Sequence, residues 1–201
     1  SAGQSGTAAL LCFVSRTCWN LRDRSLAVNA ASVIQVVKAH EPLSLSSVGL
    51  RQSAVLVPLR YENESRQSFE VILTRRSSEL PSHAGQVSFP GGGFQDGDVD
   101  IVATALRETF EEIGVGRDQV TVVGRLDDVQ TITGYHVTPV VGTMAMGTAL
   151  VADESEVARV FTVPLNVILD ASRWEQHIHE FKGSQVEMWQ LLWDGEAIWG
   201  G

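Results

Sequence analysis

The stretch that decides the fold is Arg107-Glu108-Thr109-Phe110-Glu111-Glu112-Ile113-Gly114-Val115. At about 100° per residue, Glu108, Glu111 and Glu112 stand at i, i+3 and i+4 and share one face of a helix. The opposite side carries an apolar stripe that we expect to be buried, formed by Val102, Leu106, Phe110 and Ile113. Three like charges at this spacing repel one another, so a divalent cation with oxygen ligands is their natural counterpart. Phosphate chemistry is the natural use of such a cation.

The residues on either side of this helix define where it begins and ends. Phe89-Pro90-Gly91-Gly92-Gly93 is a loop signal that we expect to interrupt both strand and helix. One of three aspartates, Asp96, Asp98 or Asp100, is expected to cap the helix that follows. Gly114 stands where a helix C-terminus prefers glycine. A glycine loop, a capped helix, a carboxylate cluster and a glycine stop together predict a site, and a solvated acidic face is the alternative.

The segment from Gly93 to Val115 resembles the Nudix box, G-x5-E-x7-R-E-U-x-E-E-x-G-U, in which U is an aliphatic residue. Its fixed positions are filled by Gly93, Arg107, Glu108, Glu111, Glu112, Gly114 and Val115. Two positions depart from the pattern: Val99 stands at the first glutamate, and Thr109 stands at an aliphatic position. Asp98 and Asp100 flank Val99, so we expect a nearby carboxylate to take over the role of that glutamate.

A second signature precedes the box. The run from Leu73 to Gly92 resembles the motif L-L-T-x-R-S-x-x-L-x-x-H-x-G-Q-V-x-F-P-G-G of coenzyme A diphosphatases. Two later blocks, Thr133 to Gly142 and Glu154 to Leu165, resemble the same subfamily. The resemblance implies a Nudix α/β/α sandwich with a mixed β-sheet. It also implies hydrolysis of the diphosphate bond of coenzyme A or its derivatives to 3′,5′-ADP and 4′-phosphopantetheine, with Mg²⁺ or Mn²⁺ as cofactor.

Two alternative functions stay open. One is a Nudix hydrolase that acts on ADP-ribose or another nucleoside diphosphate derivative. The other is a non-catalytic protein of the same fold that binds a nucleotide, which a degraded carboxylate set would favour. This chain keeps all three helix glutamates, and only Val99 departs from the acidic positions of the box.

The expected metal ligands are Glu108, Glu111 and Glu112, together with a backbone carbonyl at Gly92 or Gly93, since glycine lets the main chain approach closely. Arg107 lies four residues before Glu111, so a salt bridge can fix the orientation of that carboxylate. The general base stays open between three glutamates: Glu156, which the resemblance favours, its neighbour Glu154, and Glu108. The acidic segment around Glu156 is equally compatible with a solvated helix start.

Substrate-binding candidates come from the motif before the box, and they are Arg75, Arg76, His83, Gln86 and Ser88. The guanidinium groups of Arg75 and Arg76 match the oxygens of a 3′-phosphate or a diphosphate. The alternative for both arginines is pairing with surface acids such as Glu79. His136 is expected to face solvent on a strand.

Length and composition bound the rest. A chain of 201 residues suits one domain with a substantial core, and its formal net charge of −9 argues against nucleic acid or an anionic membrane as partner. Cys12 and Cys18 are too few for a disulfide framework, and we expect free thiols in a cytoplasmic protein. The expected partner is a small nucleotide of the coenzyme A type, and a homodimer is left open.

The chain divides into an N-terminal segment, 1–24, which includes a disordered start, and a single domain, 25–201. Periodicity predicts a helix over 25–40, a hairpin loop over 60–67 and short helical or turn segments over 154–160 and 163–169. Strands are predicted over 53–59, 69–74, 120–126, 138–144 and 186–193. The resemblance also implies a closing helix after Trp199-Gly200, which lies beyond Gly201, comes from elsewhere or is dispensable.

Overall fold

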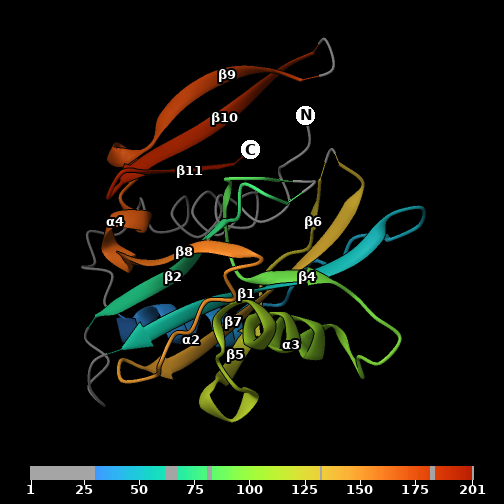
Figure 1. Ribbon diagram of the computed structural model, residues 1–201, viewed down its shortest axis with the longest axis vertical. Helices are drawn as coiled ribbons and strands as arrows, with labels where there is room; N and C mark the ends of the chain where they lie inside the picture. Colours follow the sequence, from blue (N-terminus) through green and yellow to red (C-terminus); the bar gives the residue numbers. More distant parts are fainter. Residues whose placement is uncertain (1–29, 62–67, 81–82, 132, 182–183, 201) are drawn as a thin grey trace.

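The computed structural model describes residues 30–61, 68–80, 83–131, 133–181 and 184–200 (Figure 1). The elements are α2 Ala30–Ala39, β1 Arg51–Tyr61, β2 Phe69–Arg76, β3 Val87–Ser88, β4 Gly91–Gly93, α3 Ile101–Ile113, η1 Arg117–Gln119, β5 Thr121–Arg125, β6 Val129–Gln130, β7 Tyr135–Ala145, β8 Val157–Pro164, α4 Leu165–Leu169, η2 Ala171–Arg173, β9 Glu175–Phe181, β10 Ser184–Trp193 and β11 Glu196–Gly200.

The main sheet is mixed and is built around strands β1 and β7. These two strands run parallel over their whole length, from the pair Arg51 and Tyr135 to the pair Tyr61 and Ala145. The path through the sheet is β3-β2-β1-β7-β5, while β4 pairs with β1, β6 with β7 and β8 with β2. All of these other pairings are antiparallel. Strands β9, β10 and β11 form a second, antiparallel sheet at the upper end of the view in Figure 1.

Helices cover both faces of the main sheet, so strand β1 is buried on both sides. Alternate residues of a strand point to opposite faces. Val55, Val57 and Leu59 join one core with residues of α2, whereas Ala54 and Leu56 join another with residues of α3. The α/β/α architecture with a mixed sheet is therefore confirmed. None of the described helices is long and apolar enough to cross a membrane.

Helix α3 has the expected ends. Asp100 is the N-cap, and its carboxylate accepts a hydrogen bond of 2.7 Å from the backbone N–H of Ala103. Gly114 ends the helix at φ 71°, in the left-handed region that favours glycine. Both predicted boundaries are confirmed.

The buried side of α3 differs from the expected stripe. Phe110 is 59% exposed, while Thr109 is fully buried and Glu112 is only 2% exposed. Thr109 tolerates this burial because its hydroxyl donates a 2.7 Å hydrogen bond to the carbonyl of Ala105. Leu106 and Ile113 are buried as predicted, and the prediction is wrong for Phe110. Apolar spacing alone does not reveal that the buried face of α3 also includes Glu112.

The five strand predictions are confirmed, and two other segments need correction. Strands β1, β2, β5, β7 and β10 occupy the five predicted positions. The glycine run expected to be a loop instead forms strand β4, which pairs with Ser53, Ala54 and Val55 of β1. The segment expected to be helix or turn over 154–160 becomes strand β8 from Val157, because β2 offers a free edge for pairing. Strands β9 and β11 were not predicted. The helix predicted over 25–40 is seen as α2, and residues 25–29 and 62–67 lie outside the described residues.

Candidate active site

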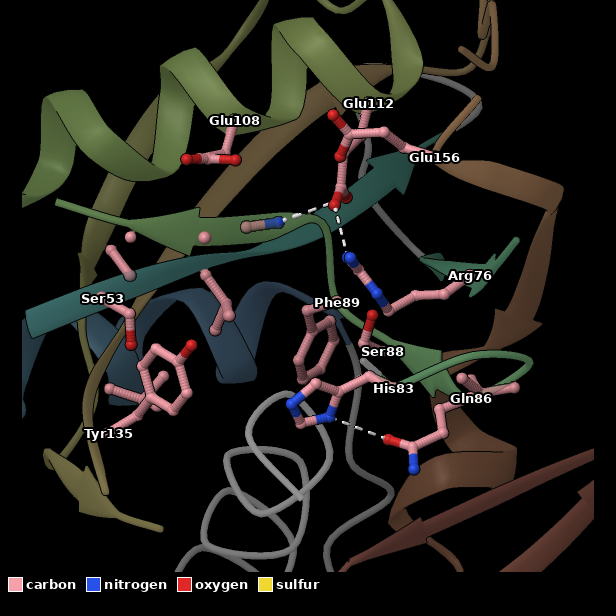
Figure 2. Close-up of a pocket in the computed structure, with 17 residues that line it drawn as sticks. Ser53, Arg76, His83, Gln86, Ser88, Phe89, Glu108, Glu112, Tyr135 and Glu156 are labelled. Atoms are coloured by element: carbon pink, nitrogen blue, oxygen red, sulfur yellow. Dashed lines mark hydrogen bonds and ion pairs between the residues drawn. The ribbon is translucent and has the colours of Figure 1, made fainter. Parts of the chain in front are cut away.

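A polar pocket of about 230 Å³ lies where α3, the glycine strand β4 and the β3 end of the sheet meet (Figure 2). Its lining includes two glutamates of α3, Glu108 and Glu112, together with Glu156 from the segment before β8. The other lining residues are Ser53, Ala54, Val55, Arg76, His83, Gln86, Val87, Ser88, Phe89, Gly91, Gly92, Gly93, Tyr135 and Val137. Residues far apart in the chain are thus gathered around one cavity.

The glycines of β4 allow the carboxylates of α3 to reach the strand backbone. A Cβ atom built on Gly92 would lie 2.5 Å from the carboxyl carbon of Glu108, so no larger residue fits beside that side chain as it stands. The backbone N–H of Gly91 donates to Oε2 of Glu112 at 3.3 Å. The glycine run therefore leaves room for the Glu108 carboxylate and supplies a backbone hydrogen bond to the Glu112 carboxylate.

Glu112 is a buried acid with few compensating contacts. Burial raises its pKa to about 8, and the nearby charges of Glu108 and Glu156 act in the same direction. Arg76 opposes this rise through its Nη1 atom, which lies 3.3 Å from Oε1 of Glu112. The pKa of Glu108 is also raised, chiefly by burial and against the effect of Arg107. This part of the pocket is strongly receptive to positive charge.

Arg107 donates hydrogen bonds to acceptors on four residues. Its guanidinium donates to Glu108 and to Glu111 at 2.8 Å each, and to the carbonyl of Gly93 at 3.0 Å. It also grips both oxygens of Asp98 at 2.9 and 3.0 Å. The orienting contact between Arg107 and Glu111 is present, but Glu111 is exposed and does not line the pocket.

Asp98 stands in contact with Arg107, whereas Val99 is 83% exposed and takes no part. The Arg107 guanidinium holds the pKa of the Asp98 carboxyl well below its usual range. Thr104 donates a further hydrogen bond of 2.8 Å to Asp98. A carboxylate one residue before the box position thus anchors the arginine of the box.

The two candidate arginines of the motif before the box lie in different places. Arg76 lines the pocket and pairs with Glu112. Arg75 does not line the pocket, and it contacts the buried carboxylate of Glu196 on β11 at 3.2 Å. Arg159 of β8 contacts the same oxygen of Glu196 at 2.9 Å. Arg75 therefore ties the second sheet to the first.

His83, Gln86 and Ser88 all line the pocket. His83 has a φ of 58°, unusual for a residue other than glycine, and its Nδ1 lies 3.2 Å from Oε1 of Gln86. Burial lowers the pKa of the His83 imidazole below its ordinary value. Ser88 is paired with Thr74 across strands β3 and β2. The three side chains form the wall opposite the glutamates in Figure 2.

The acidic segment before β8 offers one side chain to the pocket. Glu156 is half-buried and lines the cavity, whereas Glu154 is exposed and does not. The backbone holds Glu156 firmly, since its carbonyl accepts a 2.8 Å hydrogen bond from the N–H of Ser77. The segment is also linked to α3, because the N–H of Asp153 donates to the carbonyl of Glu112 at 3.0 Å.

His136 was expected to face solvent, and this prediction is wrong. The side chain is buried, and its Nε2 lies 3.1 Å from Oδ2 of Asp128. Strand β7 is central in the sheet, so both of its faces are covered. Sequence reasoning also missed Ser53 and Tyr135 as pocket residues. The alternation of side chains along β1 and β7 indicates that Ser53 and Tyr135 face the pocket only when the parallel pairing of these strands is known.

The donor set suits a hard divalent cation. Glu108, Glu112 and Glu156 are carboxylates of like charge around one cavity, and two of them have pKa values raised by burial. Oxygen ligands of this kind are those that Mg²⁺ and Mn²⁺ take in proteins. In the part of the chain that the structure describes, no three His, Cys, Asp or Glu side chains already stand close enough to hold a metal ion. The carboxylate oxygens thus match the chemistry of such a cation, and cation binding would require these carboxylates to move closer to one another.

The NUDIX domain model matches residues 50–193. The chain is 39% identical over 158 residues to a protein of Cronobacter sakazakii described as the uncharacterized Nudix hydrolase NudL, covering 79% of this chain and 80% of that one. A protein of the same description from Escherichia fergusonii is 39% identical over 150 residues, covering 75% and 76%. The chain belongs to the Nudix family. It is an enzyme of the hydrolase class, and this membership supports action on nucleoside diphosphate derivatives.

Solved structures with a similar fold are more distant. A Nudix hydrolase from M. smegmatis, RenU, has a TM-score of 0.49 at 22% identity and covers 61% of this chain and 75% of its own. The binary complex of a C. elegans Ap4A hydrolase has a TM-score of 0.47 at 20% identity, covering 60% and 87%. These likenesses concern the fold alone.

The three glycines of β4 should respond differently to alanine. In Gly91→Ala the new Cβ would lie 2.3 Å from the carbonyl of Ala54, within the central strand, so we expect Tm to fall by about 5 °C or more. In Gly92→Ala it would meet the movable end of Glu108, so kcat should fall by about tenfold or more while Tm changes little. Scanning fluorimetry and steady-state kinetics measure both quantities.

Gly93→Ala is the matched control, because nothing lies within 4 Å of its added Cβ. It should keep both Tm and kcat near the parent values. Equal behaviour of all three variants would contradict the close approach of α3 to the glycine strand.

Proposed function

We propose that this enzyme hydrolyses the diphosphate bond of coenzyme A or its derivatives, giving 3′,5′-ADP and 4′-phosphopantetheine or its acylated form. One observation carries the proposal: two motifs that follow one another in the sequence line a single pocket. Glu108 and Glu112 come from the Nudix box, and His83, Gln86 and Ser88 come from the motif that resembles coenzyme A diphosphatases. The proposal includes a small-molecule substrate and Mg²⁺ or Mn²⁺ as cofactor.

In this proposal Glu108 and Glu112, with the carbonyl of Gly92, would hold the divalent cation, and Glu111, which is exposed and does not line the pocket, remains a predicted ligand. The cation supplies charge neutralisation at the diphosphate and a more acidic attacking water. Arg107 keeps Glu108 and Glu111 oriented through its 2.8 Å contacts. Arg76 offers positive charge beside Glu112, where a phosphoryl oxygen of the substrate can share it.

Glu156 is our preferred general base. It accepts the proton of the water that attacks one phosphorus, and the bridging P–O bond then breaks to release the two phosphate products. Its support over Glu154 is that it lines the pocket while Glu154 is exposed. Glu108 competes less well, because Arg107 already occupies one of its oxygens.

The domain division, the cytoplasmic location and the homodimer belong to the proposal as well. Residues 1–24 lie outside the described part of the chain, so the division at residue 24 stays a prediction. The two sparse cysteines support a reducing compartment.

The substrate is tested by product analysis after incubation with coenzyme A, ADP-ribose and NADH in parallel, with Mg²⁺ or Mn²⁺. We expect coenzyme A to be cleaved with the highest kcat/KM, and the products to be 3′,5′-ADP and 4′-phosphopantetheine. Activity should vanish in excess EDTA and return when the cation is restored. A preference for ADP-ribose of about tenfold or more in kcat/KM would reject coenzyme A and leave the reaction class intact.

The base is tested by the pair Glu156→Gln and Glu154→Gln. The first should lower kcat by about 10²-fold or more, since a positioned base contributes on that order, with the cation affinity nearly unchanged. Glu154→Gln is the matched control, because it makes the same change at an exposed position two residues away, and it should keep the parent kcat. Metal titrations and turnover of both variants decide; loss of activity only in Glu154→Gln would move the base to that residue.

A further inference from the structure

Arg51 lies beside the pocket at the start of β1, and it faces Tyr135 on β7. The two residues are Cα partners in the parallel pairing, and Cζ of Arg51 lies 4.0 Å from the centroid of the Tyr135 ring. Alternate residues of a strand share a face, so Arg51 points to the same side as Ser53 and Val55, which line the pocket. Tyr135 lines it as well. The guanidinium of Arg51 is therefore held at the pocket rim by an aromatic ring.

Arg51 differs from the other arginines around the cavity in having no carboxylate partner within the described residues. Arg76 is paired with Glu112, Arg75 with Glu196, and Arg107 with the carboxylates of the box. The charge of Arg51 is close enough to affect His83, a residue that lines the pocket. Burial lowers the pKa of His83, and the charges of Arg76 and Arg51 add to that effect.

The rim cation and the carboxylates lie at opposite ends of one stretch of β1. Val55 pairs with Gly91, whose N–H contacts Glu112. Arg51 lies four residues earlier, about 13 Å away at 3.3 Å per residue. In Figure 2 Tyr135 and Ser53 lie on the side of the pocket away from Arg76. A nucleoside with phosphates at both its 5′ and 3′ positions can connect the glutamates with the Arg51 guanidinium when the Arg51 side chain extends toward the pocket.

We propose that Arg51, positioned by Tyr135, binds the phosphate monoester on the ribose of the substrate and selects nucleotides that carry this group. The inference rests on the proposed function, in which the 5′-diphosphate lies at the glutamates. A guanidinium presents a planar fork of donors that matches phosphate oxygens. Arg51 is exposed and has no carboxylate partner among the described residues, so its donors are available to a ligand. Arg51 is thus a specificity-determining residue rather than a part of the hydrolytic machinery.

The test compares coenzyme A with 3′-dephospho-coenzyme A as substrates of the parent enzyme and of Arg51→Gln. We expect Arg51→Gln to lower kcat/KM for coenzyme A by about tenfold or more, through KM, and to leave 3′-dephospho-coenzyme A within about twofold. Arg117→Gln, which removes the same charge from an exposed site outside the pocket, should change neither value. Equal losses for both substrates, or no loss for either, would overturn the inference.

The role of Tyr135 is separated by a conservative and a radical variant. Tyr135→Phe keeps the ring that holds the guanidinium and should keep the preference for the 3′-phosphate. Tyr135→Leu removes the ring and should lower that preference by about threefold or more, since an exposed cation–π contact is worth roughly 0.5–1 kcal/mol. An unchanged preference in Tyr135→Leu would remove Tyr135 from the proposal.

Binding measurements keep the inference independent of the reaction. Calorimetry in EDTA compares 3′,5′-ADP with 5′-AMP, and neither ligand requires turnover. We expect the parent protein to bind 3′,5′-ADP more tightly by about tenfold, and Arg51→Gln to bind both alike. If coenzyme A is not hydrolysed while this difference persists, the proposed substrate fails and Arg51 keeps its role. Equal affinities in the parent would overturn the role of Arg51 whatever the substrate.

Discussion

The burial of the Glu112 carboxylate against a strand of glycines is the constraint on which the site depends. A buried charge is costly unless it is paired, and among the described residues Glu112 has one arginine contact and one backbone N–H to offset it. Glu108 and Glu156 add like charge around the same cavity. Three carboxyl groups around one cavity are stabilised when positive charge binds between them. This electrostatic stabilisation is the physical reason for expecting a divalent cation between the enzyme and an anionic substrate.

The rest of the fold serves to hold this arrangement in place. Strand β1 is buried on both faces, and it carries the glycine strand β4 along one edge and β7 along the other. Helix α3 is fixed at its two ends by Asp100 and Gly114, and Arg107 locks its exposed side to Asp98. The carboxylates of α3 thus meet residues of β1, β3 and β7 at one cavity, although these segments are distant in the sequence.

Local signals in the sequence predicted the helix, its caps and most of the central strands, because capping and periodicity act within a few residues. The burial of Glu112 and the exposure of Phe110 could not be predicted in this way, since both depend on what packs against α3. For the same reason His136 was misplaced and β4 was taken for a loop. Ser53, Tyr135 and Arg51 were invisible because the parallel pairing of β1 and β7 joins residues more than 80 positions apart. The motifs named the chemistry, and long-range pairing determined which side chains share the pocket.

The most direct test of the account is the pH dependence of Tm with and without saturating Mg²⁺. The pKa of Glu112 is raised to about 8 in the folded protein, above its value in the unfolded chain. Its contribution to stability is therefore greatest at acidic pH and is lost as pH rises through about 8. In EDTA, Tm should fall over this range, and Glu112→Gln should abolish most of the fall. Saturating Mg²⁺ should restore Tm at high pH in the parent alone. Identical pH profiles with and without Mg²⁺ would contradict the claim that these carboxylates form a cation site.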